Sequence, residues 1–351
     1  MALTGRVASL QKITLWLLIT AIFSYASLMF WMTPHAKDVS SNRVDVVIVA
    51  RQPTCVTQTV IQSIFFYIDP PVLYIISKYD ESCKHFEAMH NKVRCYPEDS
   101  VISNMSLAVL TEYFHTKHKR FLTDDKNPLA ARIGWYYQQF LKMAVARHWP
   151  HLSDHFLLWD SDMIIINRIK LFYGARVAVQ SGGHNIEAYD ATYRRLMGRG
   201  LEMDNFGGSF TTHHAVVSKH LMNKLLDALS IDGSDDANSW ITNIVNNAGN
   251  SASALKVGFS EYGTYVSFVR QTAPRTQHVI EYKQWARAPF QVTRFFRLRA
   301  RYFGWAPCCP RHWMFWYHKY ILRQIYVGFE IGHMPMCDIR NAKFAVKYEI
   351  Q

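Results

Sequence analysis

Two aspartates, Asp160 and Asp162, stand one residue apart directly after the apolar run His155–Trp159 (HFLLW). Mg²⁺ and Mn²⁺ bind carboxylate oxygens, commonly one or two from the protein together with the phosphate oxygens of a substrate. Residues two apart share a face of a strand, and a turn after the strand also lets both reach one site. The pair therefore predicts a Mn²⁺ or Mg²⁺ site that holds a diphosphate. In isolation the same pattern is more often a solvated turn, so the surrounding elements decide its meaning.

Three further polar side chains, Gln138, Gln139 and Lys142, lie within about one turn of the predicted helix 133–148. Side chains at this spacing project from adjoining faces of a helix, so they could meet a ligand beside the metal. We therefore predict that they bind the same ligand as the aspartates. The alternative for the glutamines is a solvent-exposed polar face.

Two histidines and one glutamate complete the set of candidates. His213 and His214 precede an apolar run, and neighbouring strand residues face opposite ways, so only one of them can enter a given site. That histidine is either a metal ligand or a structural group. Glu261 follows Ser260, and its carboxylate could deprotonate an acceptor hydroxyl. The same sequence also predicts that Ser260 caps a helix with Glu261 in its first turn.

These candidates lie in a region where apolar β-branched runs alternate with amphipathic helical patterns. The predicted strands are residues 44–50, 71–77, 93–96, 155–159, 163–166, 178–181 and 215–218, and the predicted helices are 54–67, 133–148, 221–229 and 239–247. The alternation predicts an α/β fold with a mostly parallel sheet flanked by helices, in which ligands bind at the carboxyl ends of the strands. Asp160 and Asp162 stand at such an end.

The N-terminal segment has the length and composition of a membrane anchor. Residues 13–32 contain no charged side chain, and about twenty apolar residues suffice to cross a bilayer as a helix. The stretch is longer than the apolar part of a typical cleaved signal peptide, which is the alternative. Arg6 and Lys12 precede it, which predicts a cytosolic tail (1–12), a type II orientation and a short lumenal stem (33–43).

A lumenal domain would lie in an oxidising compartment, where cysteines form disulfides. The six cysteines are Cys55, Cys83, Cys95, Cys308, Cys309 and Cys337. Their spacing lacks the paired pattern of a zinc site, and a bridge from Cys83 to Cys95 could close the short polar loop between them. Asn104 begins an N-glycosylation tripeptide with Ser106.

The C-terminal region carries much of the formal net charge of +12. Nine Lys and Arg residues lie between positions 283 and 323, interleaved with aromatic residues, and no acidic residue occurs between Glu281 and Glu330. This composition is typical of a solvated basic face, of a surface that contacts an anionic membrane or acceptor, or of a segment that closes over a diphosphate. A lumenal location argues against binding to nucleic acid.

Several motifs together resemble a known family. They are Gly134–Lys142 (GWYYQQFLK), Trp159–Asp162 (WDSD), Thr212–His214, and Phe259–Tyr262 (FSEY) with Tyr265. In order and spacing they are similar to a poorly characterised family of nucleotide-diphospho-sugar glycosyltransferases that carry the Asp-x-Asp motif. The resemblance covers about residues 44–270 and implies a GT-A-like, Rossmann-related fold.

The resemblance also implies an activity. It predicts a hexosyl- or pentosyltransferase that moves a monosaccharide from a nucleotide-sugar donor to a hydroxyl of a glycan, glycoprotein or lipid, with Asp160 and Asp162 as metal and donor residues. The expected catalytic domain comprises residues 44–280, completed by 281–351, on the lumenal side of the Golgi membrane. Two alternatives remain. One is a membrane scaffold without catalysis. The other is a phosphohydrolase, but the threonine that usually follows the motif in such enzymes is missing here, where Met163 and Ile164 follow.

Overall fold

The computed structural model describes residues 43–122, 130–182, 186–249, 251–281, 284–287, 310 and 312–329. The predicted anchor (13–32) and almost all of the predicted stem lie outside these residues, as do Cys308, Cys309 and Cys337. Within the described residues, no helix combines the length and the apolar character that crossing a bilayer requires.

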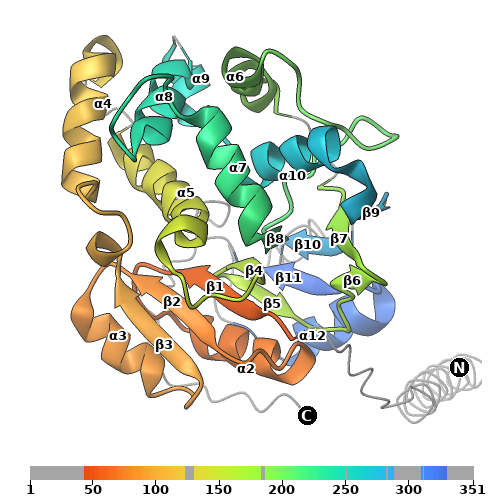
Figure 1. Ribbon diagram of the computed structural model, residues 1–351. Helices are drawn as coiled ribbons and strands as arrows, with labels where there is room; N and C mark the ends of the chain where they lie inside the picture. The colour runs from red at the N-terminus through yellow and green to blue at the C-terminus, as the bar shows by residue number, and fades with distance from the viewer. Residues whose placement is uncertain are drawn as a thin grey trace, which may run out of the picture. The chain divides into compact units, whose positions relative to one another are not determined.

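A central five-stranded sheet organises the chain, with the strand order β3-β2-β1-β4-β8 (Figure 1). Its strands are β1 (Asp45–Val49), β2 (Leu73–Ser77), β3 (Val93–Pro97), β4 (His155–Asp160) and β8 (His214–Ser218). The first four run parallel to one another, and β8 runs antiparallel to β4. The prediction of an α/β fold with a mostly parallel sheet is therefore confirmed.

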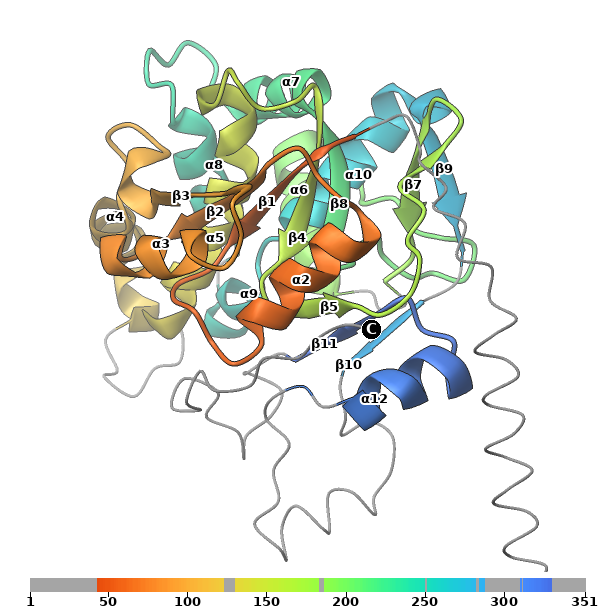
Figure 2. The ribbon, with the colours of Figure 1, turned by 90° about the horizontal axis from the view of Figure 1, so that it is seen from below.

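The sheet is buried on both faces, which explains why its strands are continuous apolar runs rather than alternating ones. On β1, Val47 and Val49 belong to one apolar core, and Val46 and Ile48 belong to a second core on the opposite face. Five helices cover the first face: α4 (Leu107–Leu122), α5 (Ala130–His148), α7 (Lys219–Leu229), α8 (Ser239–Asn247) and α10 (Glu261–Thr272). The second face is covered by α2 (Thr57–Tyr67) and α3 (Asp80–Glu87) (Figure 2).

Two small sheets extend this framework. In one, β5 (Met163–Ile165) pairs antiparallel with β11 (Tyr326–Gly328), which pairs parallel with β10 (Trp285–Arg287). The predicted strand 163–166 thus forms, but it leaves the central sheet after the turn at residues 161–162. The other sheet contains β6 (Phe172–Tyr173), β7 (Arg176–Gln180) and β9 (Gln277–Ile280).

The remaining described elements are short or peripheral. They are η1 (Glu98–Ser100), α6 (Glu187–Met197), α9 (Ala252–Lys256), η2 (Pro274–Thr276), α12 (His312–Trp316) and the π-helical segment η3 (Tyr317–Ile321).

One disulfide fastens the edge of the central sheet. Cys83 on α3 is bonded to Cys95 on β3, with a Cα–Cα distance of 5.0 Å, as their positions in the sequence predict. Cys55 is also disulfide-bonded. Asn104, the predicted glycosylation site, is exposed.

Candidate functional site

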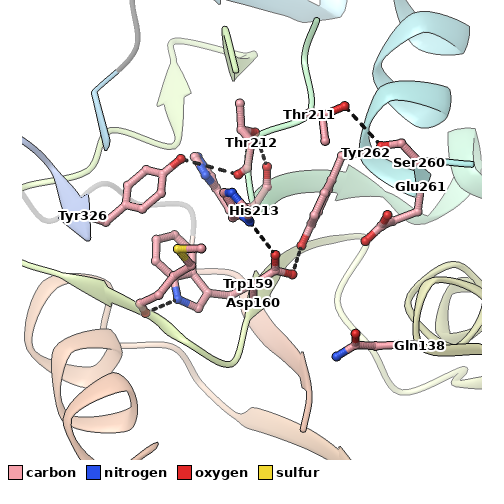
Figure 3. A network of polar contacts seen from close by, with 12 residues as sticks. Gln138, Trp159, Asp160, Thr211, Thr212, His213, Ser260, Glu261, Tyr262 and Tyr326 are labelled. Atoms are coloured by element: carbon pink, nitrogen blue, oxygen red, sulfur yellow. Dashed lines mark hydrogen bonds and ion pairs between the residues drawn. The ribbon is translucent and has the colours of Figure 1, made fainter. Parts of the chain in front are cut away.

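The site is centred on Asp160, the last residue of β4, at the carboxyl end of the parallel strands. Its Oδ1 accepts hydrogen bonds from the ammonium of Lys142 (2.5 Å) and from the hydroxyl of Tyr262 (2.7 Å). Its Oδ2 lies 2.9 Å from Nδ1 of His213 (Figure 3). The Asp160 side chain is 21% exposed, so the network holds the carboxylate in place while leaving part of it accessible.

Lys142 is the buried cation of this network. Only 5% of its side chain is exposed, and its ammonium also donates to Glu261 Oε1 at 2.7 Å and lies 4.6 Å from the centre of the Tyr262 ring. Burial lowers the pKa of Lys142, but the charges of Asp160 and Glu261 outweigh burial and raise the pKa above its ordinary value. Burial likewise raises the pKa of Asp160, but the charge of Lys142 and the hydrogen bond to His213 bring it well below its usual range. Asp160 and Lys142 are therefore both ionised at neutral pH.

Lys142 lies on helix α5. Two glutamines of the same helix hydrogen-bond to the neighbouring elements. Gln138 Nε2 donates to the carbonyl of Val49 at the end of β1 (3.1 Å). Gln139 is buried, and its Oε1 accepts the backbone N–H of Glu261 (3.0 Å). The two glutamines thus fix α5 against β1 and α10 instead of forming an exposed polar face.

Helix α10 brings Glu261 and Tyr262 to the same place. The Ser260 hydroxyl caps the helix by accepting the N–H of Gly263 (3.2 Å), as the sequence predicts, and it lies 3.2 Å from the Thr211 hydroxyl. Glu261 occupies the first turn, where a carboxylate is favoured by the helix dipole. Its side chain is 6% exposed and faces Lys142.

The two histidines diverge, although His213 is not a strand residue and the predicted reason, alternation along a strand, does not apply. His213 immediately precedes β8 with a φ of +60°, its carbonyl accepts the N–H of Asp160 (3.0 Å), and its ring meets that of Trp285 edge-on at 4.4 Å. The ring of His214 instead lies among aromatic side chains, 5.2 Å from Trp159 and 5.1 Å from Tyr326. Burial lowers the pKa of His214 to about 4, so its imidazole is neutral. The structure thus brings His213, and not His214, against Asp160.

Asp162 lies in the turn between β4 and β5, and it is partly exposed. Its carbonyl accepts the N–H of Phe329, the residue that follows β11 (2.8 Å), so the C-terminal region fixes the turn. The described part of the chain contains no cluster of three metal-binding side chains. Two carboxylates and substrate phosphates suffice for Mg²⁺ or Mn²⁺, however, and Asp160 Oδ2 retains a lone pair beyond its contact with His213. Carboxylate oxygens are the donor type that such an ion takes, and a metal site at Asp160 and Asp162 stays a prediction.

Three aromatic residues at the site are not among the predicted site residues. Tyr262 donates to Asp160, while Trp285 and Tyr326 stack with an interplanar angle of 8° beside the two histidines. Tyr262 stands directly after Glu261 in the motif Phe259–Tyr262, so the sequence carries a signal for its place at the site. Trp285 and Tyr326 lie far along the chain in the basic region, and they reach the site only through the pairing of β10 and β11 with β5.

Comparison with known sequences places the chain in a family. A family model described as a family of unknown function (DUF6492) matches residues 60–290. The chain belongs to this family. The DUF6492 match includes Asp160, Lys142, His213 and Glu261, so the whole charged network lies inside the family region. No curated protein matches the chain.

Solved structures give distant likenesses to this DUF6492 protein. The apo form of mouse xyloside xylosyltransferase 1 is 11% identical, with 82% of this chain and 99% of that chain covered and a TM-score of 0.36. The PaToxG glycosyltransferase is 13% identical, with 66% of this chain and 70% of that chain covered and a TM-score of 0.35. TM-scores below 0.5 are too low to establish a shared fold.

Proposed function

We propose that this DUF6492 protein is a metal-dependent glycosyltransferase with a GT-A-like fold, which moves a monosaccharide from a nucleotide-sugar donor to a hydroxyl of a glycan, glycoprotein or lipid. The observation that carries the proposal is the position of Asp160 and Asp162. They lie at the carboxyl ends of a parallel sheet, where α/β proteins bind ligands, and Asp160 is held ionised by three partners.

Asp162 and the remaining lone pair of Asp160 would hold Mn²⁺ or Mg²⁺ together with the donor diphosphate. When bound, such an ion supplies electrostatic stabilisation of the negative charge that develops on the departing nucleoside diphosphate. On this proposal His213 orients the Asp160 carboxylate, as hydrogen-bonding partners of metal-binding carboxylates commonly do.

Glu261 receives a different role from the one that its sequence suggests. A general base must come within hydrogen-bond reach of the acceptor hydroxyl. The carboxylate of Glu261 is instead buried, with its Oε1 2.7 Å from the ammonium of Lys142. We therefore propose that Glu261 balances the charge of Lys142 and fixes the ammonium against Asp160. Lys142, itself 5% exposed, is on this proposal a positioning residue and not a direct donor contact.

The predicted membrane anchor gives the proposed location. A type II orientation would place the catalytic domain in the lumen of the Golgi, where the disulfide between Cys83 and Cys95 is stable.

The test is donor hydrolysis and binding by the purified full-length protein. Incubation with a panel of nucleotide sugars and Mn²⁺ should release nucleoside diphosphate from one donor, and a chelator should stop the release. Asp162→Asn should abolish metal-dependent donor binding measured by calorimetry. Asp235→Asn, in an exposed loop, is the matched control and should bind as the wild type does. Donor turnover that persists in Asp162→Asn, or no binding of any nucleotide sugar, would refute the proposal, and release of inorganic phosphate from phosphoesters would favour a phosphohydrolase.

A further inference from the structure

The carboxylate of Glu261 uses only one of its two oxygens within the described part of the protein. Oε1 accepts a hydrogen bond from the ammonium of Lys142, whereas Oε2 has no partner among the described residues. Only 6% of the side chain is exposed, yet Oε2 is not sealed from solvent. Polar groups as buried as this one are normally hydrogen-bonded, and a carboxylate oxygen has lone pairs to offer. Oε2 is therefore open to a hydrogen-bond donor from outside the chain, and Figure 3 shows this carboxylate projecting from α10 into the site.

Tyr189 on α6 presents a second group of this kind. The residue is 8% exposed, and within the described ranges its hydroxyl has no hydrogen-bond partner, although it is not sealed from solvent either. A buried tyrosine hydroxyl usually finds a partner, to which it donates or from which it accepts. Tyr193, one turn later on α6, does so, because its hydroxyl donates to Gln271 of α10 at 2.8 Å. The Tyr189 hydroxyl is thus also available to a ligand.

The two groups lie against the same face of helix α5. Gln139 of α5 accepts the backbone N–H of Glu261 at 3.0 Å. Trp135, one turn earlier on α5, packs against the small apolar cluster that contains Tyr189. Side chains four residues apart on a helix are neighbours, with about 5–6 Å between their Cβ atoms. Tyr189 and Glu261 therefore approach α5 at neighbouring turns.

The charges around Tyr189 agree with this placement. The pKa of Tyr189 is raised to about 12, mainly by burial and also by the charge of Glu261, while the charge of Arg132 lowers it. The Arg132 guanidinium in turn lies 4.9 Å from the centre of the Trp135 ring. The Tyr189 hydroxyl is therefore within electrostatic reach of Glu261, and it stays protonated at neutral pH and can donate.

The pair also lies one side chain away from Asp160. The ammonium of Lys142 contacts Asp160 Oδ1 at 2.5 Å and Glu261 Oε1 at 2.7 Å. In a nucleotide sugar, the monosaccharide and the nucleoside are bonded to opposite ends of the diphosphate. A diphosphate held at Asp160 would therefore bring one of these two parts next to Glu261.

The order of the strands indicates which part this is. A cavity of about 690 Å³, lined among others by Lys78 and Glu98, lies at the carboxyl ends of β2 and β3. Helix α10 lies on the other side of β4, at β8, where the Tyr265 hydroxyl accepts the N–H of Ser218 at 2.7 Å. The open cavity has room for the larger nucleoside. The enclosed pair suits the monosaccharide, whose reacting carbon must be kept from water.

We propose that Glu261 Oε2 and the Tyr189 hydroxyl bind hydroxyl groups of the monosaccharide that is transferred, and that this monosaccharide is neutral. The inference rests on the proposed function and names the residues that select the sugar. The bound hydroxyl groups keep their protons, so Glu261 recognises the sugar without acting as a base. A sugar that carries a carboxylate is rejected, because its charge would meet that of Glu261.

The test compares nucleotide sugars with nucleoside diphosphates that lack a sugar, by calorimetry on the full-length protein with Mn²⁺. The neutral probes are UDP-glucose, UDP-galactose, UDP-xylose and GDP-mannose, the anionic probe is UDP-glucuronate, and the sugar-free probes are UDP and GDP. Tyr189→Phe should weaken binding of the preferred neutral nucleotide sugar about 3- to 10-fold, the effect of one hydrogen bond. It should leave the affinity for the sugar-free probe unchanged. The Tm should also stay nearly unchanged, because the lost hydroxyl has no partner among the described residues.

Tyr193→Phe is the matched control on the same helix. It should lower the Tm, because it removes the hydrogen bond to Gln271, and it should leave both affinities unchanged. Unchanged affinity of Tyr189→Phe for the nucleotide sugar, an equal loss for the sugar-free probe, or tighter binding of UDP-glucuronate than of the neutral probes would overturn this inference alone. If the wild type binds no nucleotide sugar, the proposed function fails and this inference fails with it.

Discussion

Replacement of Lys142 by methionine tests whether the buried cation organises the site. Methionine keeps the length of the side chain but leaves the carboxylates of Asp160 and Glu261, which contact the ammonium at 2.5 and 2.7 Å, without their shared counter-charge. Removal of one partner from a buried ion pair costs roughly 3–5 kcal/mol. Because Asp160 is 21% exposed, we expect the lower end, about 3 kcal/mol, which corresponds to a fall in Tm of roughly 4–5 °C for a domain of about 300 residues.

The dependence of this loss on pH gives a second readout. The pKa of Asp160 is lowered in the folded protein, so its stabilising contribution is present above the unfolded pKa of about 3.9 and is lost as the pH falls through the folded value. The pKa of Lys142 is raised, so its contribution is present below about 10.4 and is lost as the pH rises through the folded value. The difference in stability between wild type and Lys142→Met should therefore be largest between about pH 4 and 10 and should shrink outside that window.

The measurement is urea unfolding followed by tryptophan fluorescence, at several pH values. A double variant that adds Glu261→Gln should recover part of the loss, because it removes one of the two stranded charges. Lys224→Met, on the exposed face of α7, is the matched control and should change stability by less than about 0.5 kcal/mol. If Lys142→Met unfolds like this control, or if its deficit does not vary with pH, the ion-pair argument is wrong.

Three further predictions concern the surroundings of Asp160. His213→Asn keeps a residue that tolerates the φ of +60° but removes the ring that contacts Asp160, so we expect Mn²⁺-dependent donor affinity to fall about 10- to 100-fold in calorimetry. Gly182→Ala should destabilise the chain, because its Cβ would lie 2.2 Å from the backbone carbonyl oxygen of Thr211. In the wild type, His214 has a folded pKa of about 4 and binds a proton more readily in the unfolded chain, so the free energy of unfolding falls as the pH drops from 7 to 5. His214→Phe removes this titration, and its free energy of unfolding should fall less over the same range.

Two of these substitutions have a control in the chain. Gly134→Ala, on α5 with no atom within 4 Å of the added Cβ, should stabilise by up to about 1 kcal/mol where Gly182→Ala destabilises. His220→Phe, exposed on α7, should leave the free energy of unfolding at pH 7 nearly unchanged. A donor affinity in His213→Asn equal to that of wild type would mean that the histidine does not orient Asp160.

The sequence determined the central sheet with little error. Buried parallel strands are continuous β-branched and aromatic runs, so residues 44–50 and 155–159 predicted β1 and β4 to within one residue at each end. The position of Asp160 at a strand end follows from the same signal. The helix at residues 239–247 and the cap at Ser260 were also correct, since both depend on local spacing and on hydrogen bonds within a few residues.

Tertiary structure alone decided which of the candidates meet. Lys142, Asp160 and Glu261 lie up to 119 residues apart, and only the packing of α5 and α10 against β4 closes their ion pairs. Spacing in the sequence allowed Glu261 to be a base and His214 to be a ligand. In the folded chain the Glu261 carboxylate lies against Lys142, and the His214 ring lies among aromatic rings. Sequence periodicity reports which face of an element is apolar, whereas the partner of a polar side chain depends on elements that are distant in the chain.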